Sequence, residues 1–511
     1  MSAYCGPRDS YVSAAIGDAR ILIPFLADDS ASASICAMVY NGLTKVDRNL
    51  NVIGDLAEKW EIRDAGKTIV FYLRKNVLWH DGEKFTAKDV KFTFETILKP
   101  ETACPYISNY TDIDKIDLID DYTVKFLFKQ PYAPALSELG MGIIPEHLFK
   151  NIKNIRESGF SRGPVGTGPY RFSKWESGQY IILEANKNYF EHAPGIKRYV
   201  DRIIPDQTVE FLELASGGID YMELNPFQYE KRSRTEDFGK SLVKYKYLAP
   251  SYTYIGYNLK DPLFQDKRVR QALSYAINKE EIISGALLGL GEACSGPFRK
   301  DTAYYNDKVT LYEYNIEKAK NLLKEAGWVD ADDDGILEKD GKKFSFTLVT
   351  NQGNQAREDA ATIIQNQWAK IGVKVEIRTM AWVSFLDQVI DKKNFQAIML
   401  AWNLSLDPDP YSIWHTNAIK NNGLNSISYS NKEVDSLIEE GRREFDTEKR
   451  KKIYHEIHRL IAEDAPYTFL FFNYRTPAIN KRFKGVDAAP AGVGYNFIDW
   501  RVPEDETRYD F

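Results

Sequence analysis

The clearest pattern of metal-binding side chains lies between Asp330 and Asp340. The carboxylates at its first, third and fifth positions are Asp330, Asp332 and Asp334. Gly335 follows at the sixth position, as in the first half of a calcium loop, where the next backbone carbonyl, here that of Ile336, supplies a fourth oxygen. The second half departs from an EF-hand, because the twelfth position is Gly341 and the carboxylate of Asp340 comes one place early. The pattern leaves open a structural calcium site and a solvated acidic turn.

A second candidate site is the loop that follows a strand-like run at 397–402. This loop holds two aspartates, two prolines and the aromatic side chains of Tyr411 and Trp414. Loops at the ends of strands often carry binding residues. A structural role is the alternative, because Asp409 is well placed to cap a following helix.

No motif in the chain predicts catalysis. His455 and His458 are three residues apart, whereas the zinc motif HExxH needs four, and two histidines on a charged helix are expected to be solvated. Neither a phosphate-binding loop nor a GxSxG elbow occurs, and the glycine pair at 289–291 lacks the third glycine of GxGxxG. The sequence therefore favours a binding protein over an enzyme, with no cofactor required.

Size and charge narrow the class of protein further. A chain of 511 residues is too long for one hydrophobic core, so two or three domains are expected. The formal charge of −6 argues against a nucleic-acid partner, and no apolar run approaches the roughly 18 residues of a membrane-spanning helix. The first residues also lack the basic start and apolar middle of a signal peptide.

The four cysteines are Cys5, Cys36, Cys104 and Cys294, and no pair has metal-binding spacing. The sequence is compatible with buried free thiols and with disulfides, and free thiols are favoured.

Strand and helix signals alternate along the chain. Residues 69–73 alternate like a strand, Asp81 and Gly82 mark a turn, and Thr86 with Asp89 forms a helix-capping pattern. Amphipathic or helical segments are expected at 266–277, 315–328, 358–371 and 448–463. Strands are expected at 344–350, 374–378 and 467–472. This alternation predicts an α/β protein.

The residue order at 79–95, WHDGEKFTAKDVKFTFE, resembles the signature region of family 5 extracellular solute-binding proteins, the peptide- and nickel-type receptors of ABC importers. Tyr40–Leu43, Leu56–Trp60 and Asp266–Ile277 are similar to further motifs of that family, in the same order. The resemblance extends from Tyr40 nearly to the C-terminus.

The resemblance implies a two-lobed, periplasmic-binding-protein-like α/β fold (type II, cluster C) with an accessory domain in the first lobe. Its implied ranges are 1–50, 166–258 and 484–511 for the first lobe, 51–165 for the accessory domain, and 259–483 for the second lobe. Hinge crossings are expected near 258–262 and 480–484. Closure of the lobes on a ligand, as in a Venus flytrap, would then signal the bound state.

The same resemblance implies a set of ligand-binding residues: Tyr106, Ala401, Trp402, Asn403, Ser405, Asp407 and Tyr411. In peptide-binding members the strand at 401–403 pairs with the peptide backbone, Trp402 lines a side-chain pocket, and an Asp soon after it holds the α-ammonium. Here Ser405 takes the matching position. Either Asp407 assumes this role, or the protein does not bind a free N-terminus.

The implied function is that of a periplasmic or extracytoplasmic receptor of an ABC importer, which binds oligopeptides, most simply short peptides, between its two lobes and delivers them to the membrane permease subunits. A non-peptide solute, such as a metal chelate or an oligosaccharide, is the alternative within the same fold, and a hydrolase is less favoured. We expect a monomer. Cys5 would suit a lipid anchor, although Tyr4 is larger than the residue that usually precedes a lipidated cysteine.

Overall fold

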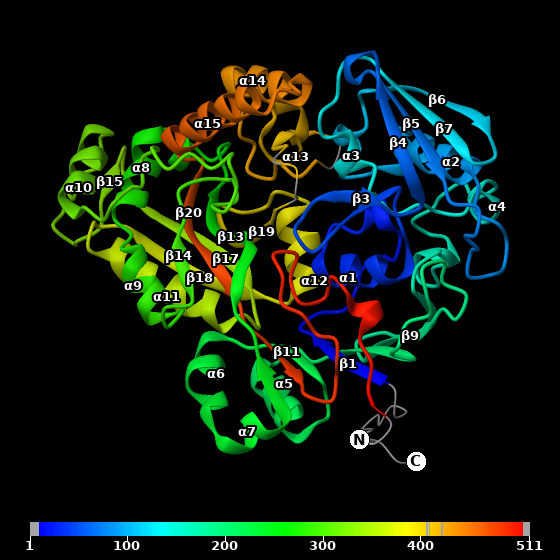
Figure 1. Cartoon of the computed structure of the whole chain (residues 1–511). Helices are drawn as coiled ribbons and strands as arrows, with labels where there is room; N and C mark the ends of the chain where they lie inside the picture. The colour runs from blue at the N-terminus through cyan, green and yellow to red at the C-terminus, as the bar shows by residue number, and fades with distance from the viewer. Residues whose placement is uncertain (1–9, 405–406, 408, 421–422, 504–511) are drawn as a thin grey trace.

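The computed structural model describes residues 10–404, 407, 409–420 and 423–503. The chain forms two lobes that lie side by side, with the blue and cyan N-terminal segments in one and the yellow and orange segments in the other (Figure 1). Among the described helices, none combines the length and apolar character needed to cross a bilayer.

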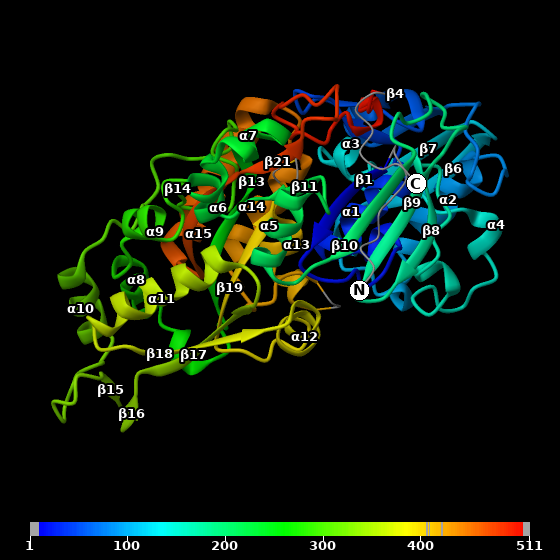
Figure 2. The same cartoon turned by 90° about the horizontal axis from the view of Figure 1, so that it is seen from below.

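The first lobe is built on two small sheets. The first has the strand order β1-β10-β9-β8, in which β1 and β10 are parallel (Figure 2). Its strands are β1 (Ser10–Ala15), β8 (Tyr170–Glu176), β9 (Tyr180–Ala185) and β10 (Arg198–Ile203), with α1 (Ser30–Val39) packed beside β8. The second sheet has the order β11-β21-β12. Its strands are β11 (Tyr221–Glu223), β12 (Leu242–Lys244) and β21 (Pro477–Asn480), and the helices around it are α5 (Gln207–Ser216), α6 (Pro226–Glu230) and α7 (Glu236–Ser241).

The accessory segment adds an antiparallel sheet of order β4-β5-β7-β6, on which one helix packs. These elements are β4 (Ala57–Arg63), β5 (Thr68–Leu73), β6 (Ile113–Asp120), β7 (Thr123–Phe128) and α2 (Ala87–Ile97), with the short pieces β2 (Thr44–Val46), β3 (Val52–Gly54), α3 (Ala135–Glu138) and α4 (Glu146–Phe149) around them. The predicted capping box is confirmed. The Thr86 side chain accepts a hydrogen bond from the backbone of the first helical turn, and the Asp89 carboxylate accepts one from the Thr86 amide. Phe71 and Phe126 belong to the same buried cluster as Tyr11 of the first lobe, so the two parts share one core.

The second lobe has a six-stranded sheet of order β14-β20-β13-β19-β17-β18. The strands are β13 (Tyr247–Tyr257), β14 (Gly291–Ala293), β17 (Ser345–Asn351), β18 (Lys374–Met380), β19 (Ala397–Asn403) and β20 (Tyr467–Arg475). Helices cover both faces: α8 (Lys267–Tyr275), α9 (Lys279–Gly285), α10 (Ile316–Glu325) and α11 (Gln355–Ala369) on one, α12 (Trp382–Phe385), α13 (Tyr411–Trp414), α14 (Lys432–Arg443) and α15 (Thr447–Asp464) on the other.

Alternation along β13 and β19 explains these two helical layers. Ile255 and Tyr257 join the apolar cluster under α8 and α11, whereas Tyr252 and Tyr254 join the cluster under α14 and α15. Successive side chains of a strand point to opposite faces, so a strand buried on both faces must be apolar at nearly every position. The helices and strands predicted in this half of the chain occur with shifts of only a few residues at their ends.

The chain crosses between the lobes at two places that differ from the expectation. Because β12 ends at Lys244 and β13 begins at Tyr247, the first crossing lies at 245–246 rather than near 258–262. The second lies at Thr476, between β20 and β21, rather than near 480–484. The strand signal at 247–257 is visible in the sequence, but the sheet it joins depends on long-range pairing.

Candidate ligand-binding cleft

A cavity of about 1620 Å³ lies between the lobes. Its second-lobe wall comprises the ends of β13 and β19, the start of α11 and the helix α12. Its first-lobe wall comprises the end of β1, the start of α1, the loop at 103–106 and side chains of β10, α5 and β11. A space of this size between two lobes is large enough for a ligand of several amino acids.

The predicted residues of β19 line this cavity: Ala401, Trp402 and Asn403. The indole Nε1 of Trp402 donates to the Tyr467 hydroxyl at 3.2 Å, and its ring lies parallel to that of Tyr254, with centroids 6.3 Å apart. These contacts fix the orientation of the Trp402 ring on the cavity wall.

The backbone of β19 has one edge open at its C-terminal end. On one side Ala401, Trp402 and Asn403 pair with β13, whereas on the other side β17 pairs only at Ala397 and Ile398. No strand of the described residues pairs with the outer edge beyond Ile398. An extended ligand can add to such an edge as a further strand, with its side chains directed alternately to either side.

Tyr106 lines the opposite wall, and its hydroxyl donates to the Ala27 carbonyl at 3.1 Å; its contact with a ligand stays a prediction. Tyr411 does not line the cavity: its ring stacks on His415, with centroids 4.1 Å apart, and lies under the guanidinium of Arg442. Ser405 lies outside the described residues, so its predicted role stays a prediction.

Asp407 lines the cavity, but its charge is compensated from behind. Both carboxylate oxygens accept hydrogen bonds from Arg450 of α15, at 2.7 and 2.8 Å. Asp409 accepts a hydrogen bond from the Tyr411 amide at 3.1 Å and pairs with Arg442 of α14 at 3.1 Å, but it does not cap α13, whose N-cap is Pro410. The arrangement therefore favours a structural role for both carboxylates over binding of an α-ammonium by Asp407.

Two features of the cavity wall, one basic and one acidic, belong to no motif that the sequence analysis recognised. Arg357, in the first turn of α11, donates to the Asn351 side chain and has no carboxylate partner among the described residues. Burial lowers its pKa to about 10, so it is cationic at neutral pH. The other group is acidic and lies on the first lobe, where Asp201, Glu210 and Glu223 line the cavity.

None of the six histidines, all within the described ranges, lines the cavity. His458 is buried rather than solvated, because its face of α15 packs on Phe298 and Tyr305; its Nδ1 accepts from the Asn306 amide at 3.0 Å. His415 is buried as well. These rings are structural.

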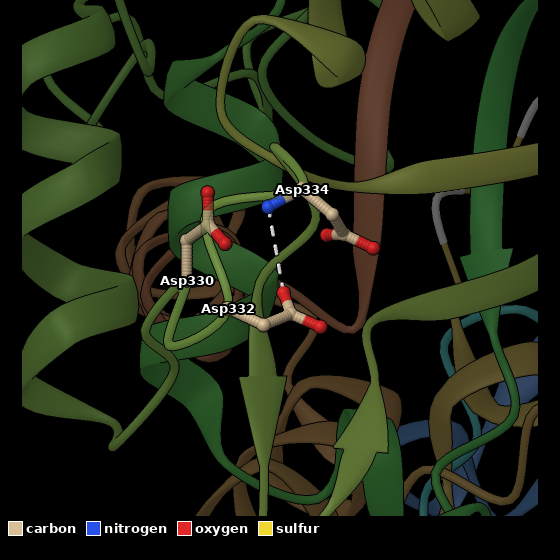
Figure 3. Close-up of side chains that lie close together, drawn as sticks. All are labelled: Asp330, Asp332 and Asp334. Atoms are coloured by element: carbon tan, nitrogen blue, oxygen red, sulfur yellow. Dashed lines mark hydrogen bonds between the residues drawn. The ribbon is translucent and has the colours of Figure 1, made fainter.

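The three aspartates of the acidic turn lie together, with carboxylate oxygens within 4.8 Å of one another (Figure 3). The ammonium of Lys343 contacts Asp332 at 2.7 Å and Asp334 at 3.1 Å. Asp340 is not part of this group, because it occupies the turn between β15 (Glu338–Lys339) and β16 (Lys342–Lys343), at the outer end of the second lobe (Figure 2). The calcium interpretation for Asp330, Asp332, Asp334, Ile336 and Asp340 stays a prediction, and Lys343 competes for the same carboxylates.

The three cysteines within the described residues are free and buried: Cys36, Cys104 and Cys294. The Cys104 and Cys294 thiols donate to the carbonyls of Phe25 and Gly296. Burial raises the pKa of all three thiols, which keeps them protonated. Cys5 lies outside the described residues.

Comparisons with known proteins agree with this architecture. Residues 51–424 match the family described as bacterial extracellular solute-binding proteins, family 5 middle. The chain is 38% identical over 499 residues to the oligopeptide-binding protein AppA of Bacillus subtilis strain 168, covering 96% of this chain and 91% of AppA.

Two solved structures share the whole fold. The structure of Bacillus subtilis AppA in complex with a nonapeptide is 37% identical, with a TM-score of 0.93, covering 97% of this chain and 99% of the other. NikZ from Campylobacter jejuni in complex with Ni(L-His) is 29% identical, with a TM-score of 0.89, covering 97% of this chain and 100% of the other.

Proposed function

This chain belongs to family 5 of the bacterial extracellular solute-binding proteins, and we propose that its solute is an oligopeptide held between the two lobes. Its place is extracytoplasmic, and membership of a receptor family confirms the expectation that it is not an enzyme. In this role it acts as a monomer and delivers the peptide to the transmembrane permease subunits of an ABC importer.

The observation that carries the proposal is the open edge of β19 on the cavity. Beyond Ile398 this edge is free of strand partners in the described chain, and Trp402 stands beside it. Backbone pairing provides affinity that does not depend on the peptide sequence, and the wide cavity accommodates side chains with water between them. The nonapeptide bound to AppA, whose structure this fold resembles, supports the same assignment.

Arg357 supplies the complementary charge for a peptide carboxylate. Its guanidinium faces the cavity and is held by an amide, Asn351, rather than by an acid. A guanidinium forms two parallel hydrogen bonds with a carboxylate, a geometry that neutral ligands do not offer.

A metal chelate is the runner-up, since NikZ holds Ni(L-His). It is less favoured because no histidine of this chain lines the cavity, although imidazole is a preferred ligand of nickel. We also propose that Cys5 anchors the receptor to the membrane. Cys5 lies outside the described residues.

Isothermal titration with paired peptides tests the proposal. Free-acid peptides should bind the wild-type protein about tenfold or more tightly than the same peptides with amidated C-termini, since a charged hydrogen bond contributes roughly 1.5–3 kcal/mol. Arg357→Gln should bind both forms equally, whereas Arg378→Gln, an exposed arginine outside the cavity, should keep the preference. Absence of binding by any peptide of a mixed library would overturn the peptide assignment.

A further inference from the structure

One corner of the cavity gathers side-chain hydrogen-bond acceptors, and two of them, on Gln207 and Glu210, have no donor among the described residues. It is formed by Asp201 of β10, Gln207 and Glu210 of α5, and Glu223 of β11, and we call these four residues the acidic corner. All four belong to the first lobe, across the cavity from β19.

Glu210 is the side chain in this corner that most requires a partner. It is only 4% exposed, and no described residue donates a hydrogen bond to its carboxyl group or forms an ion pair with it. Burial, together with the charges of Asp201 and Glu223, raises its pKa to about 8. By contrast Glu138, a partly buried acid of the cavity, accepts a hydrogen bond from Asn109 at 2.7 Å. A buried carboxyl group without a donor is costly unless something enters the cavity to meet it.

Gln207 gives a second, independent indication. Its side-chain oxygen Oε1 is buried and receives no hydrogen bond from the described residues. Gln207 lies one turn before Glu210 on α5, so both acceptors face the same part of the cavity. Buried acceptors are rarely left unpaired in folded proteins, and two together indicate a missing donor.

The remaining members keep partial partners. Asp201 accepts a hydrogen bond from the Ser13 hydroxyl at 2.7 Å. Glu223 pairs with Arg475 at 3.6 Å and accepts hydrogen bonds from the Tyr221 hydroxyl, at 3.2 Å, and from the Thr476 amide. Arg475 is the cation that the described residues place against this corner, and it compensates one of three carboxyl groups. Asp201 therefore has no cation partner among the described residues, and Glu210, whose raised pKa keeps it largely protonated at neutral pH, can ionise when a cation binds beside it.

We propose that the acidic corner binds a positively charged nitrogen of the ligand, an ammonium or guanidinium, and so makes this receptor select peptides that carry a basic group. The inference rests on the proposed peptide-binding function and names its specificity. Tyr199, Tyr221 and Tyr247 also line the cavity, and such rings cover the hydrocarbon stem of a lysine or arginine and attract its charge. That nitrogen belongs to a lysine or arginine side chain, and binding of the α-ammonium instead is an outcome that the test distinguishes.

The test uses alanine pentapeptides in which lysine is placed at each position in turn, matched by norleucine peptides, each with a free or an acetylated N-terminus. Affinities are measured by isothermal titration. At its best position, lysine should bind the wild-type protein about tenfold or more tightly than norleucine, in the range expected for charge-assisted hydrogen bonds. A preference that survives acetylation identifies the side chain, and a loss on acetylation that is equal for both peptides identifies the α-ammonium.

Glu210→Gln should abolish the preference for lysine over norleucine, and Asp237→Asn, which changes an exposed acid on α7, should keep the wild-type preference. Binding of the basic group should also release a proton near pH 7 from the wild type but not from Glu210→Gln, measured by titration in two buffers of different ionisation enthalpy. Equal affinity for all four peptide types, with no proton release, would overturn the proposal that the acidic corner binds a basic group. Absence of binding by every peptide would instead overturn the peptide function itself.

Discussion

At the scale of single residues, two arginines hold the loop that follows Trp402. Arg450 pairs with Asp407 and Arg442 with Asp409, and all four side chains are buried or nearly so. The aspartates of this loop therefore satisfy buried arginines as well as facing the cavity. The identity of the loop is readable from the sequence, but these pairings are not, because the arginines lie more than thirty residues downstream.

Asp407→Asn should destabilise the fold while leaving peptide affinity nearly unchanged. Removing one partner of a buried ion pair leaves the other charge uncompensated, which costs about 3–5 kcal/mol of unfolding free energy. Urea denaturation measures this cost, and Glu456→Gln, which breaks an exposed pair with Arg459 on the same helix, should lower stability by less than about 1 kcal/mol. Loss of peptide affinity without loss of stability would show that Asp407 contacts the ligand.

His458 should make stability fall in mildly acidic solution. Burial lowers its pKa to about 4 in the folded protein, below the usual value of about 6.5, so the unfolded chain takes up a proton first. The stability present above pH about 6.5 is lost as the pH falls towards 4, by about 3 kcal/mol for this residue.

Urea midpoints measured between pH 4.5 and 7.5 check this dependence. His458→Asn retains an acceptor for the Asn306 amide and does not titrate, so its curve should be flatter than that of the wild type. His192→Asn, a half-exposed histidine, should keep the wild-type slope. Parallel curves for His458→Asn and the wild type would contradict the assignment.

At the scale of elements, short-range sequence signals predict individual helices and turns well, but they do not predict which elements pack together. The capping pair Thr86 and Asp89 predicts the start of α2, and Gly82 adopts the positive φ of 97° that its turn requires. Tyr106 and Trp402 likewise come to the cavity as the family motifs imply. The positions of Tyr411 and Glu210 relative to the cavity could not be predicted. Which face of a helix points to the cavity depends on its packing against other elements rather than on its own sequence.

The acidic turn yields a prediction at this scale. The cluster of Asp330, Asp332 and Asp334 should bind Ca²⁺ weakly, because the Lys343 ammonium pairs with two of the three carboxylates. Lys343→Met removes this competing cation, so its melting temperature should rise at lower calcium than that of the wild type. Asp332→Asn should abolish the response, and no shift in any variant at roughly 10 mM Ca²⁺ would exclude the ion.

At the scale of the whole molecule, side chains of the two lobes contact each other directly. Arg20 of the first lobe contacts two aspartates of the second lobe: Asp387, at 2.6 Å, in the helical segment Leu386–Ile390 that follows α12, and Asp391, at 3.0 Å, directly after that segment. Arg442 of the second lobe donates to the Tyr132 hydroxyl at 3.1 Å and to the Ser108 carbonyl at 2.9 Å in the accessory segment. A ligand that bridges both walls favours the form in which these contacts exist.

Arg20→Gln should shift the receptor towards an open form. Partly exposed ion pairs contribute roughly 0.2–1 kcal/mol, so peptide affinity should fall about two- to fivefold. Small-angle scattering should show a larger radius of gyration without peptide and a compaction when peptide is added. Arg459→Gln, which removes pairs within one helix, is the matched control. Unchanged affinity and an unchanged radius for Arg20→Gln would argue against these contacts as part of closure.

Native mass spectrometry of the purified protein, before and after mild denaturation, tests the peptide-receptor function most directly. Ligand that co-purifies in the cavity should appear as a set of masses, each fitting a short peptide, and should be lost when the lobes open. Fragmentation of the released species should yield amino-acid residue masses. A single non-peptide species bound to the protein, such as a metal chelate or an oligosaccharide, would contradict the assignment.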